Sequence, residues 1–359
     1  EMKHLGFDKN HLNLYVTFEF HDWTGKHPVG RLTTTIGKVN MLDNYYEYQL
    51  FCKSLNASIH TFTREAKRSL KEKKETNSDE SIMDALGDTY DGIEDRTDWN
   101  VYCIDPHQST DFDDAFGIKL HYDEELGCVV TKLSIYISNV SILLDHLGLW
   151  KSFSTRVSTI YLPDRKRPML PTMLSDGLCS LVENTVRYAF VLDLDIHEGK
   201  IVHESYTNAK IRVNNNFRYE EKKMYECEDY QKMVDLLQSM IPHYGYMSSI
   251  RNSHDAIAYM MILMNYRTAN FLWENRAGIF RNVILGDCDE KVPDIEDMDQ
   301  DVKMFFKTWN STTAQYSDIE TLPPGTELRH DLLEMDAYVH ITSPIRRLVD
   351  LLNMIRIQK

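Results

Sequence analysis

The sequence predicts an α+β fold, in which a β-rich amino-terminal segment precedes a larger domain of mixed strands and helices. Apolar and polar residues alternate over residues 14–23 and again over 31–39, which is the period-two pattern of half-buried strands. Two more strands are expected at 99–104 and 133–137, and a long apolar helix at 254–276. The 359 residues exceed the usual size of one domain, so a large domain with a smaller companion is expected.

The amino-terminal strands predict the end of a small antiparallel barrel within residues 1–60. Pro28 and Gly30 precede the second strand, and Gly37 is placed for a turn or a bulge. In the first strand, apolar side chains occupy every other position: Leu14, Val16, Phe18 and Phe20.

A charged segment joins this part to the rest of the chain. Residues 61–76 combine good helix formers with many Arg, Lys and Glu side chains, which predicts a helix. We favour a solvated connecting helix, and a basic helix that faces a nucleic acid is the alternative. Residues 77–98 are acidic and polar, as is typical of a linker. We therefore place the connecting helix and linker at 61–95 and the large domain at 96–359.

Composition and charge limit the kinds of protein that this chain can be. Its 42% of hydrophobic residues and its intermixed charges are typical of soluble globular proteins. No apolar run approaches the roughly 18 residues that a membrane span needs. The net charge of −15 argues against a general attraction for nucleic acids. Any path for a nucleic acid must therefore be a local basic channel.

The cysteines and the first residue bear on the cellular compartment. The six cysteines form no CxxC pair and have no metal-finger spacing, so we expect reduced thiols and no structural zinc. We expect an intracellular protein, cytoplasmic first, with an organelle or the nucleus as alternatives. No signal-peptide pattern opens the chain. Because the chain does not begin with Met, we expect a processed or partial form of a longer protein.

The strongest chemical signal is an acidic segment from Ile104 to Ala115. Carboxylates packed this closely raise one another's pKa unless a hard cation neutralises them, and Asp oxygens suit Mg²⁺ or Mn²⁺ better than zinc. A calcium loop is disfavoured, since the central Gly and final Glu of an EF-hand are missing. An acidic surface turn is the alternative. Four aspartates fall within ten residues: Asp105, Asp111, Asp113 and Asp114.

A second segment, Tyr338 to Asp350, carries two adjacent arginines near the expected start of the last helix at Ser343. Guanidinium groups and the first N–H groups of a helix can meet at one anion, which suits a phosphate. A salt-bridged helix cap is the alternative for Arg346 and Arg347.

Together these two segments resemble the ribonuclease II (RNB) family of 3′-to-5′ exoribonucleases. The signature of that family is Ile-Asp, five residues, Asp, one residue and Asp-Asp, followed later by Thr-Ser-Pro-Ile-Arg-Arg, and the spacing fits at every acidic position. A third matching segment, residues 156–180, contains Tyr161-Leu-Pro163 and Pro168-Met-Leu-Pro171. The resemblance covers residues 95–359 and implies an RNB catalytic domain, a mixed sheet surrounded by helices, preceded by part of a cold-shock-type OB β-barrel.

The resemblance also implies roles for individual residues. Asp113 and Arg346 would be catalytic, with Arg346 at the scissile or adjacent phosphate. Tyr161 would stack on the terminal base, and Tyr219 would lie near the ribose. Mg²⁺, with Mn²⁺ as a possible substitute, would be held or oriented by Asp105, Asp111, Asp113 and Asp114. The expected RNA-binding set is Tyr161, Tyr219, Arg346, Arg347 and Ser343.

Three departures from the family pattern bear on the substrate. Ala258 and Tyr259 stand where family members carry two adjacent glutamates, one of which partners the tyrosine near the ribose. The chain is short between residues 246 and 257, which leaves the second base-clamping aromatic unassigned. The family's carboxy-terminal OB-type RNA-binding domain is absent from these 359 residues.

The expected function is metal-dependent hydrolysis of single-stranded RNA from its 3′ end, with release of nucleoside 5′-monophosphates. One alternative is a catalytically weak RNB module that binds RNA or protein within a larger chain. Another is a nuclease that also accepts single-stranded DNA. The expected partners are single-stranded RNA with a free 3′ end and an RNA helicase or a larger RNA-decay assembly, without a membrane.

Overall fold

The computed structural model describes residues 13–74, 82–83, 86, 90, 92–285, 312–323 and 325–358. Its centre is a seven-stranded mixed sheet with the order β11-β4-β5-β6-β9-β10-β3. Neighbours from β4 to β10 run antiparallel, whereas β11 and β3 pair in parallel with β4 and β10. The strands are β3 (Ile93–Arg96), β4 (Tyr102–Asp105), β5 (Asp114–Asp123), β6 (Cys128–Ser138), β9 (Val186–His197), β10 (Lys200–Arg212) and β11 (Asn215–Arg218).

Both faces of the sheet are covered, because its strands bury apolar side chains on both sides. On one face lie α6 (Glu228–Met240) and α7 (Ser253–Glu274), with the short α5 (Lys222–Tyr225) before them. Their core with the sheet includes Phe116, Ile135, Leu192, Met233 and Met260. The other face packs against the segment around Leu181, in a core that includes Tyr136, Val191 and Ile211.

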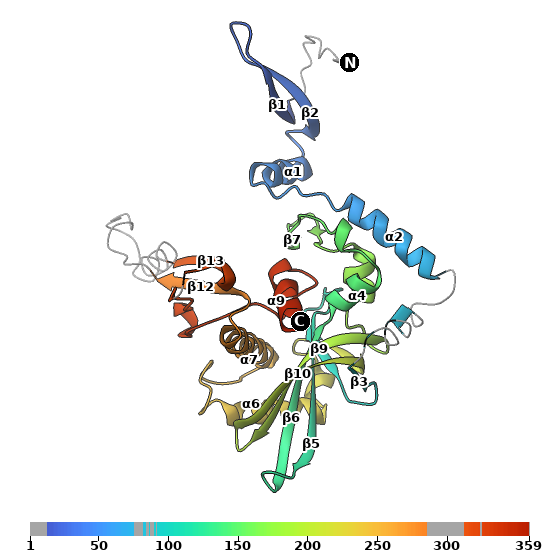
Figure 1. The fold of residues 1–359 in the computed structure, drawn as a ribbon. Coiled ribbons are helices and arrows are strands. Elements are labelled where there is room, and N and C mark those ends of the chain that lie inside the picture. Colours follow the sequence, from blue (N-terminus) through green and yellow to red (C-terminus); the bar gives the residue numbers. More distant parts are fainter. Residues whose placement is uncertain are drawn as a thin grey trace.

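A third core lies at one end of the sheet, where α4 (Val140–His146), α9 (Leu348–Gln358) and the β7–β8 hairpin gather (Figure 1). It joins residues from distant parts of the chain, among them Phe62, Leu143, Met169, Ile345 and Leu351. The shorter elements are β7 (Ile160–Tyr161), β8 (Lys166–Arg167), β12 (Ile279–Leu285), β13 (Thr312–Asp318) and helical turns at Trp150–Ser152, Leu174–Leu178, Ile319–Thr321 and Asp331–Leu333.

The amino-terminal part extends away from the sheet domain (Figure 1). Strands β1 (Leu14–Asp22) and β2 (Val29–Lys38) form an antiparallel hairpin, followed by α1 (Leu42–Cys52) and α2 (His60–Lys74). Gly37 lies beside a register shift and has a positive φ of 149°, as expected for the predicted bulge. The described residues of this part form a hairpin and not a closed barrel, so the OB assignment stays a prediction.

Several expected boundaries differ from the observed ones. The last helix begins at Leu348, because the backbone from Ser343 to Arg347 forms a turn whose N–H groups bind Asp113, Asp350 and Ser343 itself. Strand β3, which pairs with β10, lies within the carboxy-terminal part of the predicted linker, and residues 77–81, 84–85, 87–89 and 91 of that linker lie outside the described part. The predicted strand at 133–137 and the helix at 254–276 are confirmed as β6 and α7. Among the helices that the structure describes, none is long and apolar enough to span a membrane.

Candidate functional site

The acidic segment forms the connection between two neighbouring strands of the sheet. Strand β4 ends at Asp105 and β5 begins at Asp114, and the loop between them carries Asp111 and Asp113. All four carboxylates line one cavity of about 780 Å³. Sheet pairing therefore brings together the four residues that the sequence predicts as a metal site.

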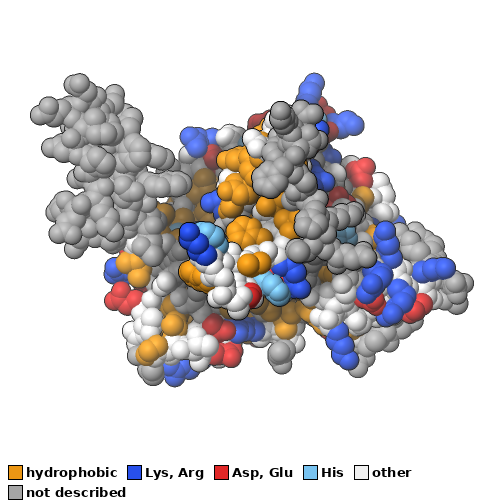
Figure 2. All heavy atoms as spheres, turned by 90° about the horizontal axis from the view of Figure 1, so that it is seen from above, with side chains coloured by type: hydrophobic (Ala, Val, Ile, Leu, Met, Phe, Trp, Pro, Cys, Tyr) orange, Lys and Arg blue, Asp and Glu red, His pale blue; other side chains and the backbone are white. Residues whose placement is uncertain are grey.

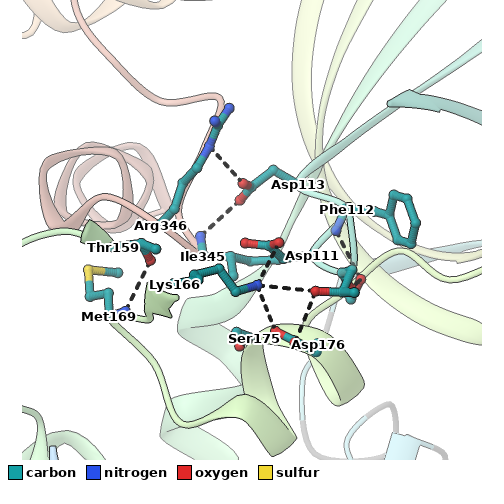
Figure 3. A network of polar contacts seen from close by, with 12 residues as sticks. Asp111, Phe112, Asp113, Thr159, Lys166, Met169, Ser175, Asp176, Ile345 and Arg346 are labelled. Atoms are coloured by element: carbon teal, nitrogen blue, oxygen red, sulfur yellow. Dashed lines mark hydrogen bonds and ion pairs between the residues drawn. The ribbon is translucent and has the colours of Figure 1, made fainter. Parts of the chain in front are cut away.

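Asp113 joins this loop to the turn before α9. Its side chain is 3% exposed and accepts a hydrogen bond of 2.9 Å from the Ile345 backbone N–H. The Arg346 Nε lies 3.2 Å from its other oxygen (Figure 3). Burial raises the pKa of Asp113 to about 7, although Arg346 and the Ile345 N–H act in the opposite direction. The Asp113–Arg346 pair is thus assembled from two distant segments.

Asp105 and Asp114 form the least compensated part of the cluster. Burial raises the pKa of both carboxyls, and the charges of Asp114 and Asp113 raise that of Asp105 further. The Asp105 Oδ2 atom is buried and has no hydrogen-bond partner within the described part of the chain. An unpartnered buried carboxylate oxygen beside a second carboxylate is a donor set that fits a hard divalent cation.

Asp111 has a different partner, since the Lys166 Nζ lies 2.9 Å from its Oδ1 atom. The same ammonium group lies 3.1 Å from the Thr110 Oγ1 and 3.3 Å from an oxygen of Asp176 (Figure 3). Over the described ranges, no group of three or more His, Cys, Asp or Glu side chains is arranged to hold a metal ion.

The structure separates the roles of the two adjacent arginines. Arg346 lines the cavity, and its guanidinium also donates to the buried Ser343 Oγ at 2.8 Å. Arg347 instead donates to Asp350 at 2.8 Å, and Asp350 also accepts from the Ser343 N–H at 2.8 Å. Neither Ser343 nor Arg347 is among the residues that line the cavity. Arg346 thus faces the cavity, while Arg347 and Ser343 hold the turn in place, and the phosphate contact stays a prediction.

The two predicted aromatic residues also line the cavity. Tyr161 is 58% exposed, and burial and the charge of Asp111 raise the pKa of its phenol. The Tyr219 ring stacks on His254, with 3.8 Å between the ring centroids and 13° between the planes. His254 is exposed and lies in the first turn of α7.

Sequence reasoning missed both His254 and Lys166. A polar residue at the start of an otherwise apolar helix is the only signal for His254. Lys166 stands within a matched motif, between Tyr161 and Pro168, but nothing in its type or spacing indicates that it reaches the carboxylates.

Ala258 and Tyr259, which stand where the family carries two glutamates, lie in different surroundings. Ala258 lines the cavity next to Ile257 and Met261. Tyr259 points into the core, where it is fully buried and its hydroxyl donates to the Tyr244 carbonyl at 2.9 Å. The wall of the cavity formed by α7 is therefore apolar beyond His254.

The face of the molecule seen from above carries hydrophobic, basic and histidine side chains near its centre (Figure 2). Hydrophobic side chains predominate there, so the described part of this face does not display the local basic channel that the net charge of −15 led us to expect.

The fold belongs to the class of α+β domains that solved RNase R structures contain. The apo form of Mycoplasma genitalium RNase R matches with a TM-score of 0.71 and 18% identity, covering 95% of this chain and 61% of that chain. Yeast Ssd1, described as a pseudonuclease, matches with a TM-score of 0.67 and 14% identity. The match covers 96% of this chain and 49% of that chain. At these identities the likeness concerns the fold alone.

Sequence comparison finds similarity to one family. Residues 93–252 match the family model of the RNB domain, so this part of the chain is similar to that family. Ribonuclease R of Buchnera aphidicola is 26% identical over an alignment of 319 residues, and the match covers 70% of this chain and 43% of that protein. Ribonuclease R of Chlamydia pneumoniae is 25% identical over an alignment of 317 residues, and the match covers 72% of this chain and 46% of that protein. The chain spans less than half the length of these two relatives.

Proposed function

We propose that this chain is a metal-dependent hydrolytic exoribonuclease that degrades single-stranded RNA from the 3′ end to nucleoside 5′-monophosphates. The observation that carries the proposal is the meeting of Asp113 and Arg346 in a cavity that also holds Asp105 and Asp114. Negatively charged carboxylates beside the guanidinium repel a phosphodiester. A cation bound to these carboxylates removes the repulsion and lets the guanidinium bind the phosphodiester. The Ribonuclease R relatives support the same assignment.

The acidic cluster fits Mg²⁺ or Mn²⁺, with Asp105 and Asp114 as the first candidates for ligands and Asp111 and Asp113 beside them. When bound, such a cation lowers the pKa of a coordinated water and neutralises charge on the phosphate. Asp113 holds the Arg346 guanidinium by one nitrogen, and Ser343 holds it by another. Arg346 is thereby aimed at the charge that develops on the phosphoryl oxygens.

The aromatic residues hold the nucleotide next to the reacting phosphate. Tyr161, on the exposed side of the cavity, offers a ring face on which a base can stack irrespective of its identity. The Tyr219–His254 stack forms a second flat surface, next to the ribose position that the family resemblance implies. Two such surfaces favour a single strand, since the bases of a duplex are already stacked on each other.

A nuclease that also accepts single-stranded DNA is a second candidate, and a specific observation favours it. The wall formed by Ile257, Ala258 and Met261 offers no side-chain group that could hydrogen-bond a 2′-hydroxyl. Discrimination between RNA and DNA depends on such contacts. A catalytically weak RNB module is the third candidate, supported by the fold likeness to the pseudonuclease Ssd1.

The test uses 5′-labelled single-stranded RNA in Mg²⁺, with the wild type, Asp113→Asn and the exposed-site control Asp98→Asn. A ladder that shortens from the 3′ end in the wild type and the control, and that Asp113→Asn abolishes, supports the proposal. Binding without cleavage by the wild type rejects it in favour of the RNB module. A DNA oligonucleotide of the same sequence separates the second candidate from the first.

A further inference from the structure

The cationic side chains at the cavity are unevenly distributed over its four aspartates. Arg346 pairs with Asp113, and Lys166 pairs with Asp111. In the described part of the chain, no lysine, arginine or histidine forms an ion pair with Asp105 or Asp114. Two of the four aspartates thus have a cationic partner in the chain, and the other two, Asp105 and Asp114, remain as a carboxylate pair without one.

Lys166 is held in this position by the strand that carries it. In β8, successive side chains point to opposite sides. Arg165 and Arg167, on either side of Lys166, both bind Glu47 of α1, at 2.9 and 2.7 Å. Their anchorage turns the Lys166 side chain the other way, toward the cavity.

The far end of Lys166 is also fixed. Its ammonium group has three acceptors from two segments, namely Asp111, Thr110 and Asp176. Asp176 is itself oriented by hydrogen bonds from Thr110, at 3.0 Å, and Ser175, at 2.5 Å. This number of partners uses all three N–H donors of a lysine. The Lys166–Asp111 contact is therefore part of a built network and not a passing contact of a surface side chain.

We propose that Lys166 is a built-in counter-ion of Asp111, so that the cavity binds a single divalent cation at Asp105 and Asp114 and excludes a second one. The inference rests on the proposed function, since it assumes that the acidic cluster binds a metal. A second divalent ion at Asp111 would lie within a few ångströms of the ammonium group, and the two cations would repel each other at close range. Asp111 then orients Lys166 and the loop, and does not act as a metal ligand.

The test is a count of bound Mn²⁺ per chain, by electron paramagnetic resonance of the free ion or by equilibrium dialysis, without RNA. We expect the wild type to bind about one Mn²⁺ tightly, as suits one carboxylate pair. Lys166→Met keeps the aliphatic stem but removes the charge, and should bind about two, because Asp111 becomes available. Lys200→Met removes the same charge from an exposed lysine of β10 and should bind like the wild type.

Two further variants keep the inference testable if Lys166→Met does not fold, which circular dichroism would show. Lys166→Gln should also gain the second ion, whereas Asp105→Asn should lose the single ion of the wild type. Two ions of similar affinity in the wild type, or no gain in either folded lysine variant, would overturn the inference. A wild type that binds no Mn²⁺ overturns both this inference and metal-dependent cleavage. One bound ion without RNA cleavage supports the inference while rejecting the proposed function.

Discussion

Arg346 shows how much of the site depends on the shape of one side chain. Its guanidinium reaches Asp113 with one nitrogen and Ser343 with another, and a lysine has a single nitrogen for both. The charge would survive an Arg346→Lys change, but the fixed direction of the donors would not. Preorganised donors are worth more than mobile ones in a transition state.

We therefore expect Arg346→Lys to lower kcat for RNA roughly 100-fold, with a much smaller change in KM. Single-turnover cleavage of a labelled oligonucleotide, followed with and without the substitution, measures the effect. Arg356→Lys on α9, where the arginine binds Asp318 away from the cavity, is the matched control. If Arg346→Lys cleaves RNA as fast as that control, the fixed direction of the guanidinium N–H donors is unimportant for catalysis.

His340 is a second residue whose surroundings matter, because they should make the stability of the fold depend on pH. Its Nδ1 atom lies 2.7 Å from the Tyr316 hydroxyl, and its ring lies near that of Tyr338. Burial lowers the pKa of His340 to about 3, and neighbouring cations lower it as well: Arg347, Arg281, His330 and Arg346. A histidine with a depressed pKa stays neutral in the fold while the unfolded chain takes up a proton.

The free energy of unfolding should therefore be unaffected by His340 above about pH 6.5 and should fall as the pH drops below that value. We expect a loss of about 1 to 2 kcal/mol from this residue between pH 7.5 and pH 5. Urea titrations of the wild type and His340→Asn at both pH values measure it, because Asn keeps an acceptor for Tyr316. The exposed His107 gives the control His107→Asn, and equal acid sensitivity of both variants would rule out this role for His340.

At the scale of elements, the Tyr219–His254 stack connects the residue after β11 with the first turn of α7. An aromatic pair of this kind contributes about 1 kcal/mol beyond the area it buries. Loss of the imidazole would leave the Tyr219 ring without support on one side. Its orientation toward the nucleotide would then be less defined.

His254→Ala should raise KM for RNA about fivefold, with kcat nearly unchanged, because the stack orients the substrate and does not touch the reacting phosphate. His254→Phe should restore most of the affinity, since it restores the ring. Steady-state kinetics on a short oligonucleotide, with the exposed His203→Ala on β10 as the control, would decide. If His254→Phe has the same KM as His254→Ala, a property of the imidazole other than stacking must account for the binding of RNA.

The elements also show which parts of the fold can be predicted from the sequence. Strands β1 and β6 follow from their periodicity, and helix α7 follows from its length and apolar composition. The expected half-burial of β1 was wrong, because its apolar side chains Phe18 and Phe20 are exposed. Strand β9 was not predicted, because its residues from Arg187 to Ile196 are all buried, and a strand buried on both faces has no alternation to detect. The turn at Ser343 was expected as a helix start, since its backbone partners Asp113 and Asp350 are visible only in the folded chain.

The same limit applies to the site. The aspartates and Arg346 could be proposed from the sequence itself, and Tyr161 and Tyr219 from the family resemblance. All of them line the cavity. Lys166 and His254 could not be proposed, because their contacts join segments whose separation in the sequence carries no signal. Sequence reasoning therefore proposed the acidic ligands of the site but not its internal counter-ion.

At the scale of the whole molecule, the cavity connects the central sheet with the turn before α9. A cation that binds only the folded form stabilises the entire domain by mass action. At a free Mg²⁺ concentration 100-fold above its Kd, we expect the free energy of unfolding to rise by about 2.7 kcal/mol.

Urea or thermal unfolding with and without Mg²⁺ measures this gain, and Asp105→Asn should abolish it. The exposed Asp98→Asn variant should keep it. An equal gain in Asp105→Asn would mean that Mg²⁺ acts elsewhere on the chain.

The hydrogen bond from Ile345 to Asp113 spans 232 residues of sequence. A ribosome adds about 5 to 20 residues per second, so roughly 10 to 50 seconds of synthesis separate the two partners. During that time the nascent chain has its aspartates but lacks the arginine that completes the pair. The Asp113–Arg346 pair can therefore form only late in synthesis, after the turn that precedes α9 has been made.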